Sequence, residues 1–572
     1  MFLGSRARLR TAVIAAAVGA GVLTAATPAA AAPAAGTRAY LVITAPGDTA
    51  AAKTAVGSNA GTVFSSYDAI GVIVAHSGAA DFASKMRTVS GVQKVGATRT
   101  SDVPAAAANP AIPDAKPQTT PPATSEPLQT DMTQIGADRA WAVNPGSPNV
   151  TVGVLDTGVD DLHDDLKANF DAANSASCAY GKLDTRAGSW RDVDTHGTHV
   201  AGTVAAAKNG RGAIGVAPGV KIASVRIAEP VTTLFFPENT ICAMVFAGDR
   251  GFEVTNNSYY TDPWLFNCPD NADQDAILEG VKRAVAYAEG KGVLNVAAAG
   301  NENYNLANKT RDTKSPNDST AVQRNITNAC LSVPTEVAGV VTVASITSAN
   351  GKSAFSNYGT DKVHIAAPGN QVYSTVPGGG YGRKDGTSMA SPHVAGVAAL
   401  LKSVNPTATP AQLRQLLATQ ADDLNCTDSR CSGTTAKNNF FGEGRVDAFA
   451  AVDTGTPPGP SFENTADVAI PDAGAAVTSP ITVSGVTGNA PATLKVDVNI
   501  VHTYRGDLVI DLIAPDGTAY RLKASSGDSA DNIVTTYTVN ASSEVANGVW
   551  NLKVQDVARV DTGYINSWKL TF

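Results

Sequence analysis

The 572-residue sequence is poor in charge and has no excess of positive charge. Lysine and arginine number 43 against 51 acidic residues, which gives a formal net charge of -8, and charged residues make up only 16% of the chain. A nucleic-acid partner would favour a basic patch, which this balance argues against. Beyond the N-terminus, no apolar run is long enough to cross a bilayer, so we expect no later membrane anchor.

Metal-binding patterns of cysteine and histidine are absent as well. None of the six cysteines stands in a CxxC or zinc-like spacing, and no HExxH motif is present. His196 and His199 could be two ligands of one metal, but a third ligand in a fixed pattern is missing. We therefore expect no zinc site.

The N-terminus has the pattern of an export signal. Arg6, Arg8 and Arg10 precede the mostly apolar stretch 11–26, and small residues follow through Ala32. A positive head, an apolar middle and a small-residue end are typical of a cleaved signal peptide. A short membrane anchor is the alternative, but glycine and threonine interrupt the stretch. We predict a signal peptide over residues 1–32 and a secreted, extracellular protein that has no membrane association after its removal.

Export would place the six cysteines in an oxidising compartment, where disulfides form. Six cysteines allow many pairings, so the spacing leaves the connectivity open. Cys426 and Cys431 share one polar loop and are the pair that we predict. Cys242 stands in an apolar segment, where a free buried thiol is the alternative.

Composition divides the rest of the chain into three folded segments and two linkers. Residues 104–127 are rich in Pro, Ala and Thr, and residues 453–462 are rich in Pro and Gly, so both are predicted linkers. Segment 37–103 shows strand and helix patterns in the order β-α-β-α-β. Segment 128–452 alternates apolar strands with helices, which is typical of an α/β parallel sheet covered on both faces. Segment 463–572 has short alternating strands, which predict an all-β sandwich.

Four residues of segment 128–452 stand where chemistry is possible. Asp156 ends a strand, His196 opens a small-residue helix, Asn301 follows another strand, and Ser388 joins a glycine turn to a second small-residue helix. Each has an ordinary alternative as a turn, capping or packing residue. Together, however, a carboxylate, an imidazole and a hydroxyl are the groups of nucleophilic acyl transfer, and an amide can donate to an oxyanion.

These residues lie in segments that resemble the signatures of the subtilisin family of serine proteases. The segments occur in the family's order of Asp, His and Ser, and they are Asp156-Thr157-Gly158, His196 to Gly202, Ala299-Gly300-Asn301 and Gly386 to His393. The resemblance covers residues 128–452 and implies a subtilisin-like parallel sheet. It implies that Asp156, His196 and Ser388 are a catalytic triad, that Asn301 is an oxyanion donor, and that the protein is a serine endopeptidase acting on polypeptide substrates.

The resemblance also implies where a peptide would bind. In this family the substrate pairs with a strand edge, and the two pocket walls match Ser258, Tyr259 and Tyr260, and Ala298, Ala299 and Gly300. Many relatives have glycine at the position of Tyr260, so its ring is expected to narrow or cover the pocket. Kexin-type relatives, which cut after paired basic residues, usually have a second aspartate at the position of Thr157, so we do not expect dibasic specificity.

A calcium site is a further implication of the resemblance. Asp165 and Asn209 match side-chain ligands of the family's strong calcium site, and the carbonyls of Ala207, Arg211 and Ala213 match its backbone ligands. These are oxygen ligands of the kind that calcium takes. An ordinary polar loop is the alternative.

The flanking segments resemble known accessory domains. Residues 37–103 resemble the subtilisin propeptide, which implies an intramolecular inhibitor whose tail lies in the active site and is cut by Ser388 itself. Residues 463–572 resemble the P domain of proprotein convertases in the segments that begin at His502, Ala514, Gly548 and Asp561. We expect a monomeric zymogen without an organic cofactor. A binding protein that kept the fold and lost the chemistry is the competing class, but all four candidate residues are present.

Overall fold

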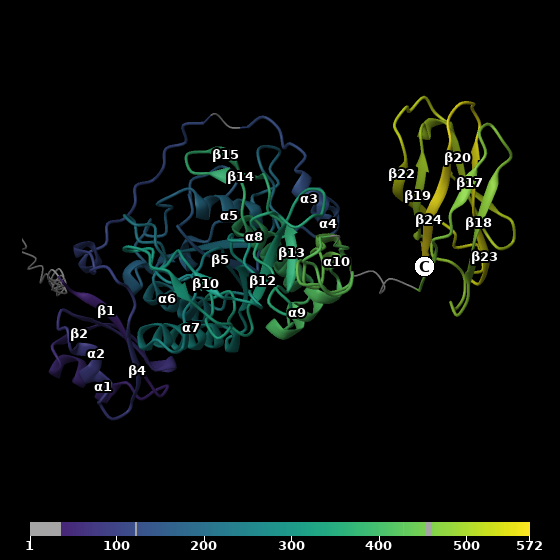
Figure 1. Cartoon of the computed structure of the whole chain (residues 1–572). Coiled ribbons are helices and arrows are strands. Elements are labelled where there is room, and N and C mark those ends of the chain that lie inside the picture. The colour runs from purple at the N-terminus through teal and green to yellow at the C-terminus, as the bar shows by residue number, and fades with distance from the viewer. Residues whose placement is uncertain (1–35, 121–122, 427, 454–459) are drawn as a thin grey trace, which may run out of the picture. The chain divides into compact units, whose positions relative to one another are not determined.

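The computed structural model describes residues 36–120, 123–426, 428–453 and 460–572. The predicted signal peptide and most of the second linker lie outside these residues. The chain divides into two compact units, with the boundary between Asp453 and Thr454. Within the first we distinguish an N-terminal unit (residues 37–103) and a central domain (residues 128–452), and the second is the C-terminal sandwich (residues 460–572) (Figure 1).

The N-terminal unit is a four-stranded antiparallel sheet in the order β2-β3-β1-β4, with two helices. The predicted order missed one strand, β2, because none of its residues is fully buried and its sequence lacks a clear apolar alternation. Between β2 and β3, Gly71 turns the chain with a φ of +67°. The elements are β1 (Arg38–Thr44), α1 (Ala50–Ser58), β2 (Gly61–Tyr67), β3 (Val72–Ser77), α2 (Phe82–Met86) and β4 (Val92–Ala97).

The central domain contains a seven-stranded parallel sheet in the order β13-β12-β9-β8-β5-β7-β6. This confirms the predicted parallel α/β architecture. The strands are nearly all buried along their length, as the continuous apolar runs indicated. They are β5 (Thr151–Asp156), β6 (Ala176–Ser177), β7 (Lys221–Arg226), β8 (Val254–Asn257), β9 (Leu294–Ala298), β12 (Val341–Ile346) and β13 (Ile365–Pro368).

Alternate residues of these strands enter two cores on opposite faces of the sheet. Val152 and Val154 of β5 join the core that contains α5 and α8, whereas Leu155 joins the core that contains α6 and α7. Leu41 and Val74 of the N-terminal unit enter the second core, so this unit packs against α6 and α7 (Figure 1). The helices are α3 (Thr130–Gln134), α4 (Ala137–Val143), α5 (His196–Ala205), α6 (Pro237–Arg250), α7 (Ala272–Gly290), α8 (Thr387–Val404), α9 (Pro410–Thr419) and α10 (Ala448–Val452).

Three disulfides and two small hairpins complete the central domain. Cys426 is bonded to Cys431, which confirms the predicted pair. Cys242 is bonded to Cys178 rather than free, and Cys268 is bonded to Cys330. Among the residues that the structure describes, no helix is long and apolar enough to cross a membrane. The remaining strands are β10 (Arg311–Asp312), β11 (Arg324–Asn325), β14 (Val372–Val376) and β15 (Gly380–Lys384).

The C-terminal sandwich consists of two antiparallel sheets around one apolar core, as predicted. One sheet has the order β16-β24-β19-β22, with β17 also paired to β24, and the other has the order β18-β23-β20-β21. Trp550 and Trp568 are fully buried between them. The strands are β16 (Ser461–Asn464), β17 (Val468–Ile470), β18 (Val477–Val483), β19 (Leu494–His502), β20 (Leu508–Ile513), β21 (Ala519–Lys523), β22 (Ile533–Val539), β23 (Gly548–Asp556) and β24 (Gly563–Thr571).

Candidate active site

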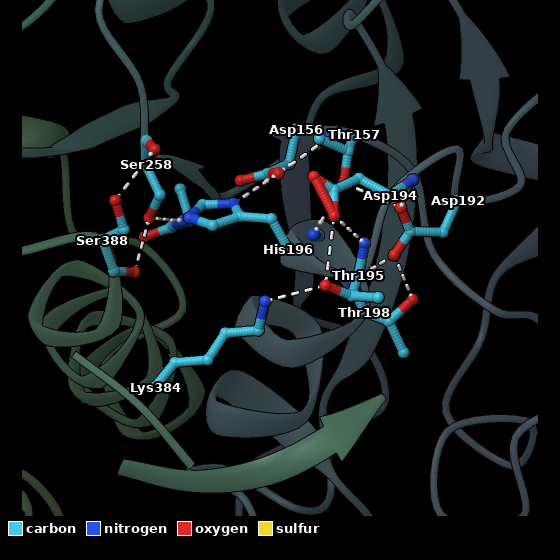
Figure 2. A network of polar contacts seen from close by, with 12 residues as sticks. Asp156, Thr157, Asp192, Asp194, Thr195, His196, Thr198, Ser258, Lys384 and Ser388 are labelled. Atoms are coloured by element: carbon cyan, nitrogen blue, oxygen red, sulfur yellow. Dashed lines mark hydrogen bonds and ion pairs between the residues drawn. The ribbon is translucent and has the colours of Figure 1, made fainter. Parts of the chain in front are cut away.

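The four candidate residues gather at the carboxyl edge of the parallel sheet. Asp156 is the last residue of β5, His196 is the first of α5, Asn301 follows β9, and Ser388 is in the first turn of α8. The carboxyl ends of parallel strands share one edge, which is why segments so distant in sequence meet there. Figure 2 shows the side chains of Asp156, His196 and Ser388 lying close together.

The imidazole of His196 is bonded to a buried carboxylate. Its Nδ1 lies 2.8 Å from Asp156 Oδ1, and Asp156 Oδ1 also accepts a hydrogen bond from Thr157 N at 2.7 Å. Asp156 is fully buried, whereas the side chain of His196 is 25% exposed. Burial alone would lower the pKa of His196, but the Asp156 carboxylate outweighs burial and holds this pKa above its ordinary value. The pairing places the proton on Nδ1 and leaves Nε2 as the basic nitrogen.

A second buried carboxylate, Asp192, fixes the start of α5 against the end of β5. It accepts hydrogen bonds from Thr157 Oγ1 at 2.8 Å and from Thr198 N at 2.9 Å. Thr157 Oγ1 accepts in turn from Gly197 N at 2.8 Å, so one network holds the segments that carry Asp156 and His196 (Figure 2). Burial raises the pKa of Asp192. The sequence did not single out this residue, because an aspartate before a helix is ordinarily a cap or a turn.

Ser388 lies at the N-terminal end of α8, where a glycine allows the turn. Gly386 has a φ of +152°, which side-chain-bearing residues rarely adopt. The Ser388 hydroxyl donates to the carbonyl of Ser258 at 3.2 Å, and the Ser258 hydroxyl donates to the carbonyl of Ser388 at 2.8 Å. Among the described residues, no hydrogen bond joins Ser388 to His196. The small residues of α8 allow close packing, since a Cβ on Gly396 would lie 2.6 Å from Val216.

The Asn301 side chain is held by its oxygen. Its Oδ1 accepts hydrogen bonds from Thr387 N at 2.8 Å and from Thr387 Oγ1 at 2.9 Å. Thr387 Oγ1 also accepts from Gly300 N at 3.0 Å, which ties the end of β9 to the start of α8. Because the amide oxygen is occupied, Nδ2 is the end of the side chain available to donate beside Ser388.

A cavity of about 270 Å³ adjoins Ser388 and Asn301. Five of the six predicted wall residues line it, namely Ser258, Tyr259, Tyr260, Ala298 and Gly300. Ala299 does not line the cavity, and its carbonyl instead accepts from Asn357 Nδ2 at 2.9 Å. The sequence did not identify the remaining lining residues. Two of them adjoin predicted residues, since Glu302 follows Asn301 and Thr387 precedes Ser388. The remaining lining residues are Thr233, Leu234, Phe235, Asp262, Leu265, Glu302, Asn317, Ser332, Thr335, Asn357 and Thr387.

The ring of Tyr260 is fixed in the cavity wall. Its hydroxyl accepts a hydrogen bond from Asn317 Nδ2 at 2.9 Å, and the same amide nitrogen donates to Asp262 Oδ1 at 2.6 Å. Asp262 is buried and also accepts from Phe235 N at 2.5 Å. Burial raises the pKa of Asp262 to about 6.

Comparison with known proteins decides the family. The model of the subtilase family matches residues 147–444, and the model of the proprotein convertase P-domain matches residues 491–572. The chain belongs to the subtilase family. A curated relative, the extracellular basic protease of Dichelobacter nodosus, is 30% identical over 504 residues, which cover 77% of this chain and 75% of the relative.

Two other similarities support more limited conclusions. Leupeptin-inactivating enzyme 1 of Streptomyces exfoliatus is 59% identical over 184 residues, which are 31% of this subtilase and 42% of that relative, so the chain spans less than half of it. The crystal structure of the epidermin leader peptide processing serine protease of Staphylococcus aureus aligns with a TM-score of 0.58 at 22% identity. That alignment covers 74% of this chain and all of that one, and it supports the fold alone.

The residues that this subtilase offers for calcium form a hydrogen-bonded cluster. Asp165 Oδ1 accepts from Asn209 Nδ2 at 3.1 Å, and Asp165 Oδ2 accepts from Ala213 N at 3.0 Å and from the Tyr381 hydroxyl at 2.8 Å. Calcium takes oxygen ligands, whereas the donors here are hydrogen-bearing groups. In this arrangement hydrogen bonds satisfy the carboxylate of Asp165.

The two other expected calcium ligands lie in the same loop. Ala207 N donates to the backbone carbonyl of Asp165 at 2.8 Å, and Arg211 N donates to Asn209 Oδ1 at 3.2 Å, which fixes the orientation of that amide. In the part of the chain that the structure describes, no group of three or more His, Cys, Asp or Glu side chains forms a metal site. Calcium binding therefore stays a prediction, and no catalytic step is assigned to a metal.

The tail of the N-terminal unit passes beside the cavity of this subtilase and does not enter it. Thr100 N and Ser101 N each donate to the carboxylate of Asp318 at 2.8 Å. The chain then turns back, since Val103 N donates to Thr37 O at 2.8 Å, next to the start of β1. No residue of the range 37–103 lines the cavity. The expected placement of the tail in the active site is therefore not the one found here.

Proposed function

We propose that this subtilase is a secreted serine endopeptidase that hydrolyses polypeptides through an acyl-enzyme intermediate. The observation that carries the proposal is the bond between His196 Nδ1 and Asp156 Oδ1 at 2.8 Å, beside Ser388 at the start of α8. An imidazole oriented by a buried carboxylate is the base that such a hydroxyl needs. The inactive binding-protein alternative has no comparable observation in its favour.

The proposed reaction uses each of these groups at a stated atom. The Ser388 hydroxyl rotates from the Ser258 carbonyl to His196 Nε2, which takes its proton as Oγ attacks the substrate carbonyl. Asp156 stabilises the resulting imidazolium. His196 then gives the proton to the leaving amine, and the acyl group stays on Ser388 Oγ. Water, deprotonated by His196, attacks this ester, and the carboxylic acid leaves as the Ser388 hydroxyl is restored.

Asn301 is the proposed donor to the oxyanion. Its oxygen is held by Thr387, so Nδ2 is directed by a fixed side chain and needs no reorganisation during the reaction. The backbone N–H of Ser388 lies in the first turn of α8, where helix N–H groups lack partners within the helix. Two such donors stabilise the negative charge that develops on the substrate oxygen.

Polypeptide substrates are proposed to bind in extended form along Ser258, Tyr259 and Tyr260. Pairing with backbone supplies affinity, and the cavity supplies side-chain preference. The hydrogen bond from Asn317 to Tyr260 holds the ring as a wall of this cavity. The first substrate side chain would then lie between Tyr260 and the Ala298–Gly300 wall.

The N-terminal unit is proposed to be an intramolecular inhibitor that the enzyme itself removes. Its burial of Leu41 and Val74 against α6 and α7 supports a specific docked unit. Since its tail turns away at Val103, cleavage between residues 104 and 128 requires this linker to move into the cavity. The N-terminal signal pattern, the three disulfides and the similarity to an extracellular protease support secretion. We also propose a monomer, and a structural calcium ion only if the cluster at Asp165 rearranges.

A Ser388→Ala chain tests this function. We expect casein hydrolysis to fall by about 10⁴-fold or more, a range measured for triad variants of subtilisin itself. The N-terminal unit should also stay attached during purification. Ser403→Ala, a serine of the same helix whose hydroxyl bonds to Ala399 O, is the matched control and should retain both activities. Unchanged hydrolysis or processing in the Ser388→Ala chain would overturn the assignment of the nucleophile.

A further inference from the structure

Arg99 of the N-terminal unit is buried inside the central domain. Its residue is 3% exposed, although arginine is almost never buried unless it is paired. Its Nη2 lies 2.6 Å from Glu229 Oε1 and 2.5 Å from Glu238 Oε1, and its Nη1 lies 3.3 Å from Glu229 Oε2. The guanidinium carbon also stands 3.7 Å from the ring centre of Phe236. The guanidinium is therefore held by two carboxylates and an aromatic face.

The side chains that bind the Arg99 guanidinium all belong to the central domain. Glu229 and Glu238 have side chains that are 2% and 1% exposed, and Phe236 is 1% exposed. Glu238 stands in the first turn of α6, where the helix dipole favours a negative charge. Planar, bidentate carboxylate geometry and an aromatic face are the features that recognise arginine rather than lysine.

The site adjoins the substrate cavity. Glu229 N donates to Leu234 O at 3.1 Å, and Leu234 and Phe235 line the cavity. On the other side, Asp318 binds Thr100 and Ser101, and its neighbour Asn317 holds Tyr260 in the cavity wall. A chain that follows residues 99–101 thus lies along the margin of the cavity.

Removal of the N-terminal unit would leave this site without its cation. Breaking a buried ion pair by removing one partner is strongly unfavourable, because the remaining charges are uncompensated. Two carboxylates so close together also repel each other, so a positive partner stabilises their ionised forms even more.

We propose that Glu229, Glu238 and Phe236 form a guanidinium-binding site of the central domain. Arg99 fills it in the unprocessed chain, and an arginine side chain of a polypeptide substrate, on the N-terminal side of the cleaved bond, fills it afterwards. The second half of this proposal, the binding of a substrate arginine, rests on the proposed function. The first half, the binding of Arg99, concerns the folded chain alone. The site lies outside the cavity, so it adds a selective contact to that of the first pocket.

The first half is tested by chemical rescue in full-length Ser388→Ala protein, which needs no activity. Adding Arg99→Ala should lower the melting temperature by about 5 °C or more, because two buried carboxylates lose their cation. Millimolar ethylguanidinium should restore part of this loss, whereas ethylammonium should not. Arg87→Ala is the matched control, since Arg87 pairs with Asp273 at an exposed position of the same unit, and neither cation should affect it. Equal rescue by both cations, or by neither, would overturn the site.

The substrate half is tested on processed enzyme with a peptide library. We expect peptides with arginine at one position before the cleaved bond to be cut at least ten-fold faster than peptides with citrulline there. Glu238→Gln should reduce this ratio to below two-fold, whereas Glu289→Gln, whose carboxylate pairs with Arg414 elsewhere, should leave it unchanged. If Glu238→Gln does not mature, the arginine and citrulline peptides still decide the question on the parent enzyme. Equal cutting of both would overturn the proposal, whereas absence of any Ser388-dependent cutting would overturn the proposed function instead.

Discussion

Two of the places where a buried carboxylate meets a nitrogen base or cation in this subtilase differ in how permanent the partner is. At Asp156 the partner is His196, which belongs to the same domain and is held by the network around Asp192. At Glu229 and Glu238 the partner is Arg99, which always carries its charge and comes from another unit. In the proposed reaction the first carboxylate stabilises a charge that arises only transiently, whereas the second pair lies against a permanent charge. A buried acid can thus serve catalysis or docking, according to where its partner is attached.

The largest expected effect is at the first of these places. Asp156→Asn replaces a charged acceptor by an amide, which no longer stabilises the imidazolium and can favour the wrong tautomer. We expect kcat to fall by about 10⁴-fold, as for the corresponding Asp-to-Asn change in a chymotrypsin-type triad, with a small change in KM. Steady-state kinetics on a peptide ester and on casein measure this. Asp165→Asn, a buried aspartate outside the triad, is the control for loss of a carboxylate, and an equal fall in both variants would contradict the triad assignment.

The second place predicts a pH dependence of stability with a definite sign. Burial raises the pKa of Glu229 to about 7 despite the opposing effect of Arg99. A carboxyl group whose pKa is raised on folding stabilises the folded chain most below its unfolded pKa, and this stability is lost as the pH rises through about 7. In the Ser388→Ala parent, Glu229 should therefore contribute a fall in unfolding free energy of at most about 3 kcal/mol between about pH 5 and pH 7.5. Adding Glu229→Gln should remove this contribution and flatten the curve.

Urea denaturation at a series of pH values checks this prediction. Other carboxyl groups with raised pKa values, such as Asp262, contribute equally to parent and variant, so the difference between the two curves isolates Glu229. Glu289→Gln is the control and should reproduce the parent curve. An unchanged slope in Glu229→Gln would contradict the prediction.

The contrast between the two places also shows what sequence can and cannot foretell. Asp156, His196, Asn301 and Ser388 were identified because each lies in a motif whose neighbours fix the local backbone. Arg99 has no motif, and its pairing with Glu229 joins residues 130 positions apart, so only the docking of two folded units creates it. Strand β2 was missed because half-buried strands lack a clear apolar alternation.

Similar reasons explain the other gaps. The pairing of Cys178 with Cys242 depends on how β6 and α6 approach each other in the fold, which spacing does not encode. The tail of the N-terminal unit was expected in the cavity by family likeness, but the carboxylate of Asp318 and the return to β1 hold it outside. Sequence thus predicted the fold class of the central domain and of the C-terminal sandwich, whereas most contacts between distant segments were not predicted.

A third buried carboxylate, Asp165, sharpens the comparison because its partners are neutral donors. Tyr381→Phe removes the hydroxyl that donates to Asp165 Oδ2 at 2.8 Å and should lower the unfolding free energy by about 1.5–3 kcal/mol, the usual range for a bond to a charged group. Tyr373→Phe is the control, because Tyr373 stacks on Tyr381 and its hydroxyl has no hydrogen bond among the described residues. Denaturation with chelator and with added calcium measures both. Equal stability of the two variants in chelator, together with a large gain on adding calcium, would favour an ion over the hydrogen-bonded cluster.

The smallest expected effect concerns the charge around His196. Lys384 Nζ donates to Thr195 Oγ1 at 2.8 Å, next to His196 in the chain, and its charge lowers the pKa of the imidazole (Figure 2). His196 must be neutral to act as a base, so activity is lost as the pH falls through this pKa. Lys384→Ala removes the repulsion, raises the pKa of His196, and should move the acid limb of kcat/KM to higher pH at low ionic strength.

Salt and a conservative variant separate this effect from a structural one. Because Lys384 is only partly buried, its influence should weaken at about 1 M salt, where the screening length is about 3 Å. Lys384→Arg keeps the charge and should keep the parent profile. A shift that persists in high salt, or that appears in Lys384→Arg, would mean that the hydrogen bond to Thr195 positions His196, and the electrostatic account of this pKa would then be wrong. A downward shift would contradict it directly, because no removal of a positive charge can make the imidazolium easier to deprotonate.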